Sequence, residues 1–521
     1  MTAERQLTLY DRFALSAERH PERTALEVDG LRIPYGELHR RAGRVAEDLL
    51  ALLRGERPRR VGVLANRSPA AYLGYLAATR LGSTVVPLSP TAATERSAAI
   101  VSLARLDAVV TDTADPGLLP VPVLRLDPEP ADVPDAPSHP FVSGPVPHPA
   151  GGDDIAYIVF TSGSTGTPKG VPVLQRNVSA MLDHAIPRYG LGPGSRVSQS
   201  FDLTFDPAVW DMFTTWASGA TLVVPTRSEL VRPARFIARR EITHWFSVPS
   251  VITYAARLHD LAPEAMPSLR WSLFGGERLT VEQAAAWQRA APGSIIENLY
   301  GPTETTVACT QYRLPSRPAE WPPSANGSLP IGTPYPHLEH LVLDELGHPS
   351  DEGELCVRGS QRFPGYLDPA DNAGRFVEFD GQRAAVRHDV SPPAPEHYYR
   401  TGDRVARVDG GLLHLGRIDQ QVKIRGHRIE LAEVEAALRT LPDVEEAVVL
   451  ALSDPHGELG LHALYTGAEQ DPVALRSSLG QRLPAPMIPR AISFLASLPL
   501  NANGKIDRRA LAAGLEKGAV R

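Results

Sequence analysis

The chain has 521 residues and a formal net charge of -7, from 53 Lys and Arg residues and 60 Asp and Glu residues. This length predicts more than one domain, and the mixing of both signs along the chain disfavours a nucleic-acid-binding arm. Two cysteines, Cys309 and Cys356, are too few for a disulfide framework or a CxxC metal cluster. The charged N-terminus lacks the apolar core of a signal peptide, and the apolar stretch at 73–88 is interrupted by Arg80. We therefore expect a cytoplasmic protein that binds neither nucleic acid nor a membrane.

Short β-rich segments alternate with helical patterns along the chain. The segments VGVLA at 61–65 and ATLVVP at 220–225 are typical of strands, and EQAAAWQRAA at 282–291 is typical of a helix. This alternation predicts α/β layers. A Pro-, Asp- and Gly-rich stretch at 115–154 is either a linker between domains or a long surface connection within one. We favour the connection, because the strand that follows needs a sheet to join. A second Pro-rich break, at 391–399, precedes the C-terminal region.

A strand-like segment runs into a loop of glycines and hydroxyls in YIVFTSGSTGTPKG at 157–170. Successive backbone N–H groups in such a turn can wrap phosphate oxygens, and Lys169 adds a full positive charge. The P-loop pattern GxxxxGK[ST] does not fit, because Pro168 precedes the lysine and Gly170 follows it. Ser164 lacks the GxSxG surroundings of a hydrolase nucleophile. The alternatives are a flexible surface loop and a phosphate loop, and the hydroxyls, the lysine and the buried-type strand favour the second.

Further motifs lie on both sides of this loop, and their order along the chain resembles the adenylation domains of nonribosomal peptide synthetases, within the adenylate-forming superfamily. The motifs are TSGSTGTPKG at 161, IPYGEL at 33, LGSTVVPLSP at 81, FDPAVWDMF at 205, NLYGPTETT at 298, GELCVRG at 353, YRTGD at 399, GRIDQQVKIRG at 416 and NGKIDRR at 503. The resemblance implies an α/β fold with a large N-terminal multi-layer α/β domain over residues 1–418. It also implies a small, mobile C-terminal α+β lid domain over residues 419–521.

The resemblance implies an ATP site with Mg²⁺. Acyl adenylate formation brings a carboxylate to the α-phosphate of ATP, so positive charge must offset the repulsion of the two anions. The implied contacts are Thr161, Ser162, Gly163, Ser164, Thr165, Gly166 and Lys169 at the pyrophosphate, Gly275, Gly276, Asn298 and Tyr300 at the adenine, Thr303 at the α-phosphate, Glu304 on Mg²⁺, and Asp403 with Arg417 at the ribose. As isolated patterns, Glu304, Tyr300 and Asp403 would be a capping carboxylate, a core ring and a turn residue.

The C-terminal motifs imply a second half-reaction. By the resemblance, Lys505 reaches the substrate carboxylate and α-phosphate as a catalytic residue, although a lysine after Asn-Gly is by itself typical of a surface turn. Asp419 matches a hinge position, and Gly426 matches the lining of a tunnel for a phosphopantetheine thiol, where a side chain would collide with the arm. The alternative for this segment is a charged hairpin leading to an amphipathic helix from Leu431.

The resemblance also implies an amino acid as the substrate. Asp206 falls where related domains place a carboxylate against the substrate's ammonium. The other implied pocket residues are Pro207, Trp210, Ser247, Ser272, Phe274, Leu299, Val307 and Ala308. Asp206 is the only titratable group in this set, so a charged substrate side chain would be left unpaired. We expect a small or medium, uncharged side chain, with a hydroxyl as one option because of the serines. The bulk of Phe274 keeps a nonstandard or β-amino acid open.

The position of the NGK motif near the end of the chain indicates which partner proteins to expect. The chain ends at Arg521, shortly after this motif, so we expect a stand-alone enzyme of antibiotic biosynthesis that loads a separate phosphopantetheinylated carrier protein. A small activating protein of the kind that some relatives need is a further possible partner. The rival functions are a D-alanine carrier-protein ligase, an acyl-CoA or aryl acid synthetase, and a non-catalytic scaffold. Asp206 disfavours plain fatty or aryl acids, and the presence of Lys169, Glu304, Asp403 and Lys505 disfavours a scaffold.

Overall fold

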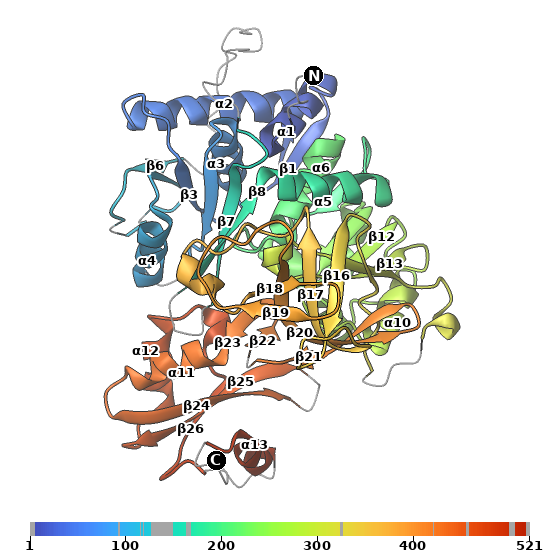
Figure 1. Cartoon of the computed structure of the whole chain (residues 1–521). Helices are drawn as coiled ribbons and strands as arrows, with labels where there is room; N and C mark the ends of the chain where they lie inside the picture. The colour runs from blue at the N-terminus through green and yellow to red at the C-terminus, as the bar shows by residue number, and fades with distance from the viewer. Residues whose placement is uncertain are drawn as a thin grey trace. The chain divides into compact units, whose positions relative to one another are not determined.

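The computed structural model describes residues 6–91, 94–114, 116–117, 119–126, 150–162, 168–322, 327–419, 421–454, 458–499 and 506–516. The chain divides into two units (Figure 1). The larger unit consists of Met1–Pro90, Val101–Val159 and Gly170–Gly416, and the smaller unit of Thr91–Ile100, Phe160–Lys169 and Arg417–Arg521. Strands and helices occur in both units, which confirms the predicted mixed α/β class.

A nine-stranded sheet of the larger unit positions most of the predicted site residues. Its strands, in spatial order, are β15 (Thr333–Pro334), β14 (Thr310–Arg313), β13 (Ile295–Tyr300), β12 (Trp271–Phe274), β11 (His244–Ser247), β9 (Arg196–Ser198), β10 (Thr221–Val223), β1 (Thr24–Val28) and β2 (Leu31–Pro34). The pairs from β13 through β1 are parallel, and antiparallel strands close both edges. Parallel strands direct their carboxyl ends to one edge, where α/β proteins bind ligands.

Two further sheets belong largely to the same unit. A six-stranded sheet has the order β6 (Val123–Arg125), β5 (Ala108–Thr111), β3 (Arg60–Leu64), β4 (Thr84–Leu88), β7 (Ile155–Thr161) and β8 (Lys169–Leu174). An antiparallel sheet has the order β16 (Leu338–Leu343), β17 (Glu352–Gly359), β20 (Tyr398–Val408), β18 (Phe376–Phe379) and β19 (Ala384–Arg387), with β21 (Gly411–Arg417) paired to β20. The fully buried runs of β4 and β5 are typical of parallel strands covered on both faces.

Ten α-helices precede or alternate with these strands in the described chain up to residue 419, and the helix Thr94–Ala104 extends across the boundary between the two units. They are α1 (Leu9–Arg19), α2 (Tyr35–Leu52), α3 (Pro69–Arg80), α4 (Thr94–Ala104), α5 (Gln175–Arg188), α6 (Pro207–Ser218), α7 (Arg227–Val231), α8 (Pro233–Arg239), α9 (Ser250–Arg257) and α10 (Val281–Ala290), with short 3₁₀ helices at Thr303–Thr305, Pro318–Glu320 and Pro369–Asn372. Aromatic side chains join several of them in one core. Phe13 of α1, for example, meets Trp216 of α6 edge-on at 5.8 Å between ring centroids.

The smaller unit contains the hairpin β22 (Gln421–Ile424) and β23 (His427–Glu430), the sheet β24 (Val444–Ser453), β25 (Leu459–Gly467) and β26 (Ala491–Phe494), and the helices α11 (Leu431–Arg439), α12 (Pro472–Gly480), a 3₁₀ turn (Ala485–Met487) and α13 (Arg508–Glu516). Alternate residues of β24 face opposite sides of the sheet. Val449 packs with α11 and α12, and Val448 packs with α13 (Figure 1). Both faces of this small sheet are therefore covered.

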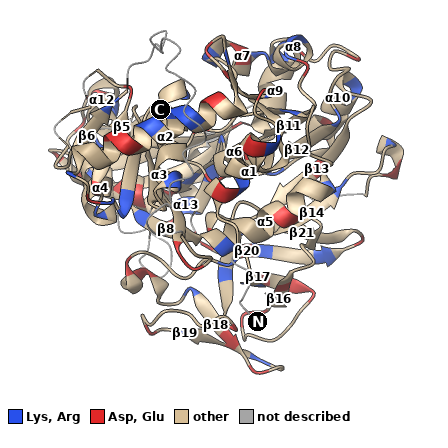
Figure 2. Ribbon diagram, turned by 90° about the horizontal axis from the view of Figure 1, so that it is seen from above, with Lys and Arg blue, Asp and Glu red and all other residues tan. Residues whose placement is uncertain are grey.

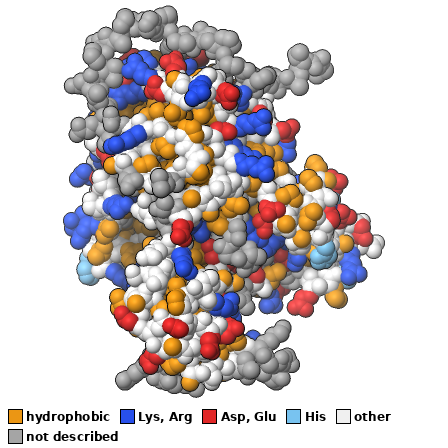
Figure 3. All heavy atoms as spheres, turned by 90° about the vertical axis from the view of Figure 1, so that its left-hand side faces the viewer, with side chains coloured by type: hydrophobic (Ala, Val, Ile, Leu, Met, Phe, Trp, Pro, Cys, Tyr) orange, Lys and Arg blue, Asp and Glu red, His pale blue; other side chains and the backbone are white. Residues whose placement is uncertain are grey.

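Charges of both signs are dispersed over the ribbon in Figure 2, and charged side chains interrupt the hydrophobic ones on the face shown in Figure 3. This agrees with the mixed sequence distribution of acidic and basic residues. Among the residues with described positions, no helix is both long enough and apolar enough to cross a membrane.

Candidate active site

Asp206 lies directly before α6, and Pro207 occupies the first turn of this helix. Proline suits that position because the N–H that it lacks has no intrahelical partner there. The Asp206 side chain is 7% exposed, and its Oδ2 accepts a hydrogen bond from the Val307 backbone N–H at 3.0 Å. The motif FDPAVWDMF therefore places a buried carboxylate at the start of a buried helix, against the loop that follows β13.

Burial is the largest influence on the Asp206 carboxyl, and the pKa of this group rises to about 6. The hydrogen bond from Val307 opposes the rise, the negative charge of Glu304 adds to it, and a hydrogen bond from the Thr303 side chain lowers the pKa again. The carboxyl is thus mostly ionised at pH 7 although it is shielded from water. A cationic ligand such as an ammonium would stabilise the ionised form.

An apolar group adjoins this carboxylate. Trp210 of α6 meets Phe246 of β11 edge-on, with 5.2 Å between the ring centroids. The predicted pocket residues Leu299, Val307 and Ala308 are buried in the same core cluster as this pair. Phe246 is a residue that the motifs did not identify, although the alternation of β11 places it on the face opposite to Ser247.

Three other predicted pocket residues make different contacts. The hydroxyl of Ser272 accepts a hydrogen bond from the Trp287 indole N–H at 2.8 Å, and Phe274 meets the same indole at 5.3 Å between centroids. The Ser247 hydroxyl accepts one from the Trp245 indole N–H at 2.8 Å. These contacts give no support to a hydroxyl-selective pocket, because each serine hydroxyl accepts from an indole and also has a second partner, the Ser294 hydroxyl at 2.7 Å for Ser272 and the Val248 carbonyl at 3.3 Å for Ser247. The lining roles of the three residues remain predictions.

The residues predicted for adenine and ribose lie at the end of β13 and on β20. The Tyr300 hydroxyl donates to Asp403 Oδ2 at 2.7 Å, and His414 Nε2 lies 3.0 Å from Asp403 Oδ1. Asn298 donates through Nδ2 to the Pro330 carbonyl at 2.8 Å. The structure thus brings Tyr300 and Asp403 together, and it adds His414, which the sequence did not single out. Two hydrogen-bonding neighbours hold the Asp403 carboxylate in one orientation.

The structure explains the two glycines of the FGGE turn, Gly275 and Gly276, in different ways. A Cβ atom on Gly275 would lie 3.0 Å from the Leu299 carbonyl oxygen, which is too close for an ordinary contact. Gly276 has a φ of 83°, in the left-handed region that glycine adopts without steric cost. This turn lets the backbone after β12 approach the end of β13.

Glu304 lies in the 3₁₀ turn Thr303–Thr305 and is fully buried. Its Oε1 accepts a hydrogen bond from the Tyr366 hydroxyl at 2.6 Å. Among the residues that the structure describes, no three or more His, Cys, Asp or Glu side chains form a group that could hold a metal ion. A single carboxylate nevertheless fits Mg²⁺, because this ion binds through one or two carboxylates together with substrate phosphates and water. Glu304 is therefore a fitting ligand for Mg²⁺ that arrives with ATP.

The loop predicted to bind phosphate is described only at its two ends. Thr161 is the last residue of β7, and Lys169 is the first residue of β8. Ser162 donates through its hydroxyl to the Arg428 carbonyl at 2.8 Å, within the smaller unit. Gly163, Ser164, Thr165, Gly166 and Lys505 lie outside the described residues. The roles predicted for this loop and for the lysine remain predictions.

The C-terminal unit holds the predicted hinge and tunnel residues. Arg417 donates through Nε and one Nη to the two carboxylate oxygens of Asp419 at 2.7 and 2.8 Å. Burial opposes ionisation of Asp419, but this pairing lowers its pKa overall. Gly426 follows Arg425 in the turn between β22 and β23, and both have left-handed φ values, 51° and 79°. Such a pair is typical of a two-residue hairpin turn. The turn conformation therefore favours glycine at position 426, in addition to the predicted need for space.

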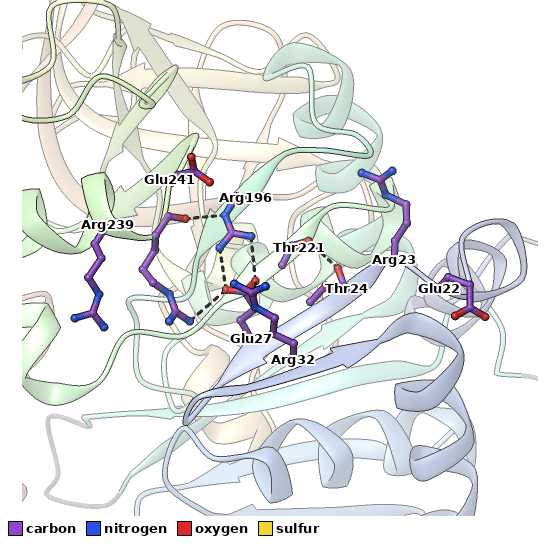
Figure 4. Close-up of a pocket in the computed structure, with 10 residues that line it drawn as sticks. Glu22, Arg23, Thr24, Glu27, Arg32, Arg196, Thr221, Arg239 and Glu241 are labelled. Atoms are coloured by element: carbon purple, nitrogen blue, oxygen red, sulfur yellow. Dashed lines mark hydrogen bonds and ion pairs between the residues drawn. The ribbon is translucent and has the colours of Figure 1, made fainter. Parts of the chain in front are cut away.

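A cavity of about 460 Å³ lies beside β1, β9 and β10, and none of the predicted site residues whose positions are described lines it. Figure 4 shows Arg196 directed at Glu27, and the distance between Arg196 Nη2 and Glu27 Oε2 is 2.8 Å. Burial opposes the ionisation of Glu27, but Arg196, Arg240 and Arg32 together lower its pKa. These ion pairs join β1 to β9 and to the end of α8. The volume of this cavity therefore does not mark it as the catalytic site.

Two family models match the chain. The model for the AMP-binding enzyme matches residues 13–367, and the model for the AMP-binding enzyme C-terminal domain matches residues 433–505. The phosphinothricin tripeptide synthetase PhsC of Streptomyces viridochromogenes is 35% identical over 520 residues, which cover 97% of this chain and 45% of PhsC. The chain spans less than half the length of the curated relatives that it matches. The expected stand-alone architecture therefore remains a prediction.

Solved structures resemble the chain over nearly its whole length. The Vibrio cholerae adenylation domain AlmE, in complex with glycyl-adenosine-5'-phosphate, is 27% identical with a TM-score of 0.79, covering 99% of this chain and 100% of that chain. An artificially fused Adenylation-PCP di-domain from Klebsiella oxytoca, NpsA-ThdA, is 25% identical with a TM-score of 0.77, covering 95% of this chain and 94% of that one. These likenesses confirm the predicted fold class, a large α/β body with a small C-terminal domain.

Proposed function

Since this chain belongs to the AMP-binding enzyme family, as an adenylation domain of the nonribosomal peptide synthetase type, we propose that it uses ATP to activate an amino acid. The substrate has a small or medium, uncharged side chain, and the product is an aminoacyl adenylate. The acyl group then passes to the phosphopantetheine thiol of a carrier protein. The fused Adenylation-PCP protein among the structural relatives supports a partner of this kind.

The observation that carries the proposal is the buried carboxylate of Asp206. Its Oδ2 accepts the Val307 N–H, and no cation among the residues that the structure describes lies at hydrogen-bonding distance from it. Two unit charges 4 Å apart attract by about 4 kcal/mol at an effective dielectric constant near 20. An amino acid whose ammonium lies against Asp206 would therefore gain binding free energy on this scale. A carboxylic acid without the amine would leave the buried charge of Asp206 uncompensated.

The residues of the larger unit support the first half-reaction. Tyr300 offers a ring face for the adenine, and Asp403, held by Tyr300 and His414, can accept hydrogen bonds from both ribose hydroxyls. Asp206 would hold the ammonium and so direct the substrate carboxylate away from itself. Mg²⁺ held by Glu304 would offset the charge of the ATP phosphates. Lys169 and Arg417, which belong to the smaller unit, remain the residues predicted from the sequence to add positive charge at the nucleotide.

ATP–pyrophosphate exchange with a panel of L-, D- and β-amino acids tests the proposal. We expect exchange that depends on one amino acid or a small set with uncharged side chains. A preference for D-alanine or for a β-amino acid would support the corresponding carrier-protein ligase instead. Exchange driven equally well by fatty or aryl acids would contradict the role of Asp206. No exchange with any acid would contradict adenylation.

The pH dependence of amino acid use follows from the raised pKa of Asp206. The ionised form binds the ammonium, and protonation below a pKa of about 6 removes the negative charge. The kcat/KM for the amino acid should therefore be flat near pH 7 to 8 and fall about tenfold per pH unit below 6. Pyrophosphate exchange from pH 5 to 8 at saturating ATP measures this profile. A flat profile down to pH 5 would contradict the assignment.

Replacement of Gly426, in the smaller unit, distinguishes two explanations for a glycine at this position: space for the phosphopantetheine arm and the conformation of the turn. Asparagine tolerates the left-handed conformation of this turn but adds a side chain. If the glycine provides space for the phosphopantetheine arm, Gly426→Asn should slow carrier loading about tenfold or more and leave pyrophosphate exchange within about twofold. If the turn conformation is the only requirement, loading should stay normal.

Carrier loading in that experiment is followed by mass spectrometry of a phosphopantetheinylated carrier protein. Gly381→Asn is a matched control, because Gly381 also has a positive φ, 99°, and no atom lies within 4 Å of where its Cβ would be. Equal losses of exchange and loading in Gly426→Asn would argue for a general disturbance of the hairpin rather than for a tunnel.

A further inference from the structure

The loop between β13 and β14 has an unusual backbone conformation. Thr306 and Val307 have φ values of 60° and 71°, in the left-handed region that β-branched residues rarely adopt. Each such residue costs of order 1–3 kcal/mol and persists only where the surroundings enforce it. The loop is also narrow, because a Cβ atom on Gly301 would lie 2.6 Å from the Ala308 Cα. The strained residues are the ones that direct the Val307 N–H at Asp206.

Gln361 binds the inside of this loop. It follows β17, some fifty residues further along the chain, and its side chain is fully buried. Its Nε2 donates to the carbonyls of Thr305, Thr306 and Ala308, at 3.1, 3.3 and 2.8 Å. Carbonyl oxygens can only accept, so these three contacts fix which end of the amide is the NH₂ group. One side chain therefore clamps the carbonyls on both sides of Val307.

Other contacts hold the glutamine in place. Its Oε1 lies 2.6 Å from His337 Nε2, which must carry the proton because the amide oxygen accepts. The Thr306 hydroxyl donates to the Gln361 backbone carbonyl at 2.7 Å. The Phe363 N–H donates to the Glu304 carbonyl at 2.9 Å. The segment 361–363 thus contacts the loop from Glu304 to Ala308 at several points.

We infer that Gln361 is a positioning residue for amino acid selection: it holds the strained loop so that the Val307 N–H and the Asp206 carboxylate keep the geometry in which an ammonium binds. This inference rests on the proposed function of Asp206. Gln361 itself contacts neither Asp206 nor, in this role, the substrate. Its effect passes through the loop carbonyls: that of Thr306 also accepts from the Ala308 N–H at 2.9 Å, so Thr305 and Ala308 are the two whose buried carbonyls depend on the Gln361 amide.

A second glutamine provides a matched control. Gln288 of α10 donates through Nε2 to the carbonyls of Ala291, Pro292 and Ser294, at 3.0, 3.4 and 3.1 Å. It clamps the loop before β13, whereas Gln361 clamps the loop after β13. The two side chains make the same kind of contact at opposite ends of one strand. A general loss of stability should appear in both variants, but a change in amino acid selection should appear only at Gln361.

The test replaces each glutamine with methionine, which keeps the length but removes the hydrogen bonds. For Gln361→Met we expect the KM for the amino acid to rise about 10- to 100-fold, from the loss of two or three hydrogen bonds to buried carbonyls. The KM for ATP should change less than about threefold. Gln288→Met should leave both KM values within about twofold.

The pH profile gives an independent readout. The Val307 hydrogen bond lowers the pKa of Asp206, so its loss should move the acid limb of kcat/KM for the amino acid to higher pH in Gln361→Met. Glu304 is the titratable group whose charge acts on Asp206, and the Asp206 charge together with burial raises the pKa of the neighbouring Tyr157, which therefore stays neutral. Both remain in the variant. A purely structural role for Gln361 would lower the yield or Tm without moving this limb.

His337→Phe supplies a second, milder variant in case Gln361→Met does not fold. It removes the donor to Gln361 Oε1, and the KM for the amino acid should rise about three- to tenfold in the same direction. The inference is overturned if wild type is active but Gln361→Met shows the same amino acid KM and the same acid limb of the pH profile as Gln288→Met. If Gln361→Met does not fold, His337→Phe takes its place in this comparison. Absence of exchange in wild type with every amino acid overturns the proposed function instead.

Discussion

Asp206→Asn is expected to raise the KM for the amino acid by about 100- to 1000-fold and to change the KM for ATP little. Asparagine retains an oxygen that can accept the Val307 N–H, so the loop has little reason to move. The variant removes only the charge, and an attraction of about 4 kcal/mol corresponds to a factor near 1000 in affinity. Initial rates of pyrophosphate exchange at varied amino acid concentration measure the effect.

The same variant should lose discrimination between an amino acid and its analogue without the amine. Wild type should reject the analogue, because a buried carboxylate would be left without a cation. In Asp206→Asn the two compounds should differ by less than about tenfold. A variant that retained both the wild-type KM and the wild-type discrimination would contradict the placement of the ammonium. The acid limb near pH 6 should also be absent from its profile.

Lys505→Ala is expected to lower the adenylation rate by about 100- to 1000-fold. The residue lies outside the described part of the structure, so this expectation comes from the motif NGKIDRR and from the chemistry. A preorganised donor that stabilises charge only in the transition state contributes on this scale to kcat. The amino acid KM should change much less than kcat, in contrast to the Asp206 variant.

Single-turnover formation of labelled adenylate measures the Lys505 effect directly. Lys505→Arg is the informative companion, because it retains the charge but changes the shape of the donor group. We expect it to recover only part of the rate. Near-normal pyrophosphate exchange in Lys505→Ala would refute the catalytic role. Lys505 would then be an ordinary residue of a surface turn.

The sequence predicted those features that depend on local patterns. The motif FDPAVWDMF placed Asp206 next to a proline that starts a helix, and the structure has α6 at Pro207–Ser218. Alternating strands and helices predicted α/β layers, and the structure has a nine-stranded sheet in such an arrangement. Gly276 is likewise explained by one left-handed turn. In each case the residues that determine the feature are neighbours in the chain.

Features that depend on distant residues were not predicted. Gln361 acts on a loop some fifty residues earlier, and a single polar residue after a strand carries no signal of its partners. Tyr366 and His414 join the site in the same way, through hydrogen bonds to Glu304 and Asp403. For Ser272 and Phe274, motif alignment could not show that Trp287 would contact both. Tertiary packing decides these contacts.

The most direct test of amine-dependent activation is adenylate formation from a matched pair of acids in wild-type protein. The pair consists of the best amino acid found by exchange and the same compound with the amine replaced by hydrogen, each incubated with ATP and Mg²⁺. We predict that the amino acid gives an aminoacyl adenylate detectable by mass spectrometry and that its analogue reacts at least about 100-fold more slowly. Equal rates for the two compounds, or no adenylate from either, would contradict selection by Asp206.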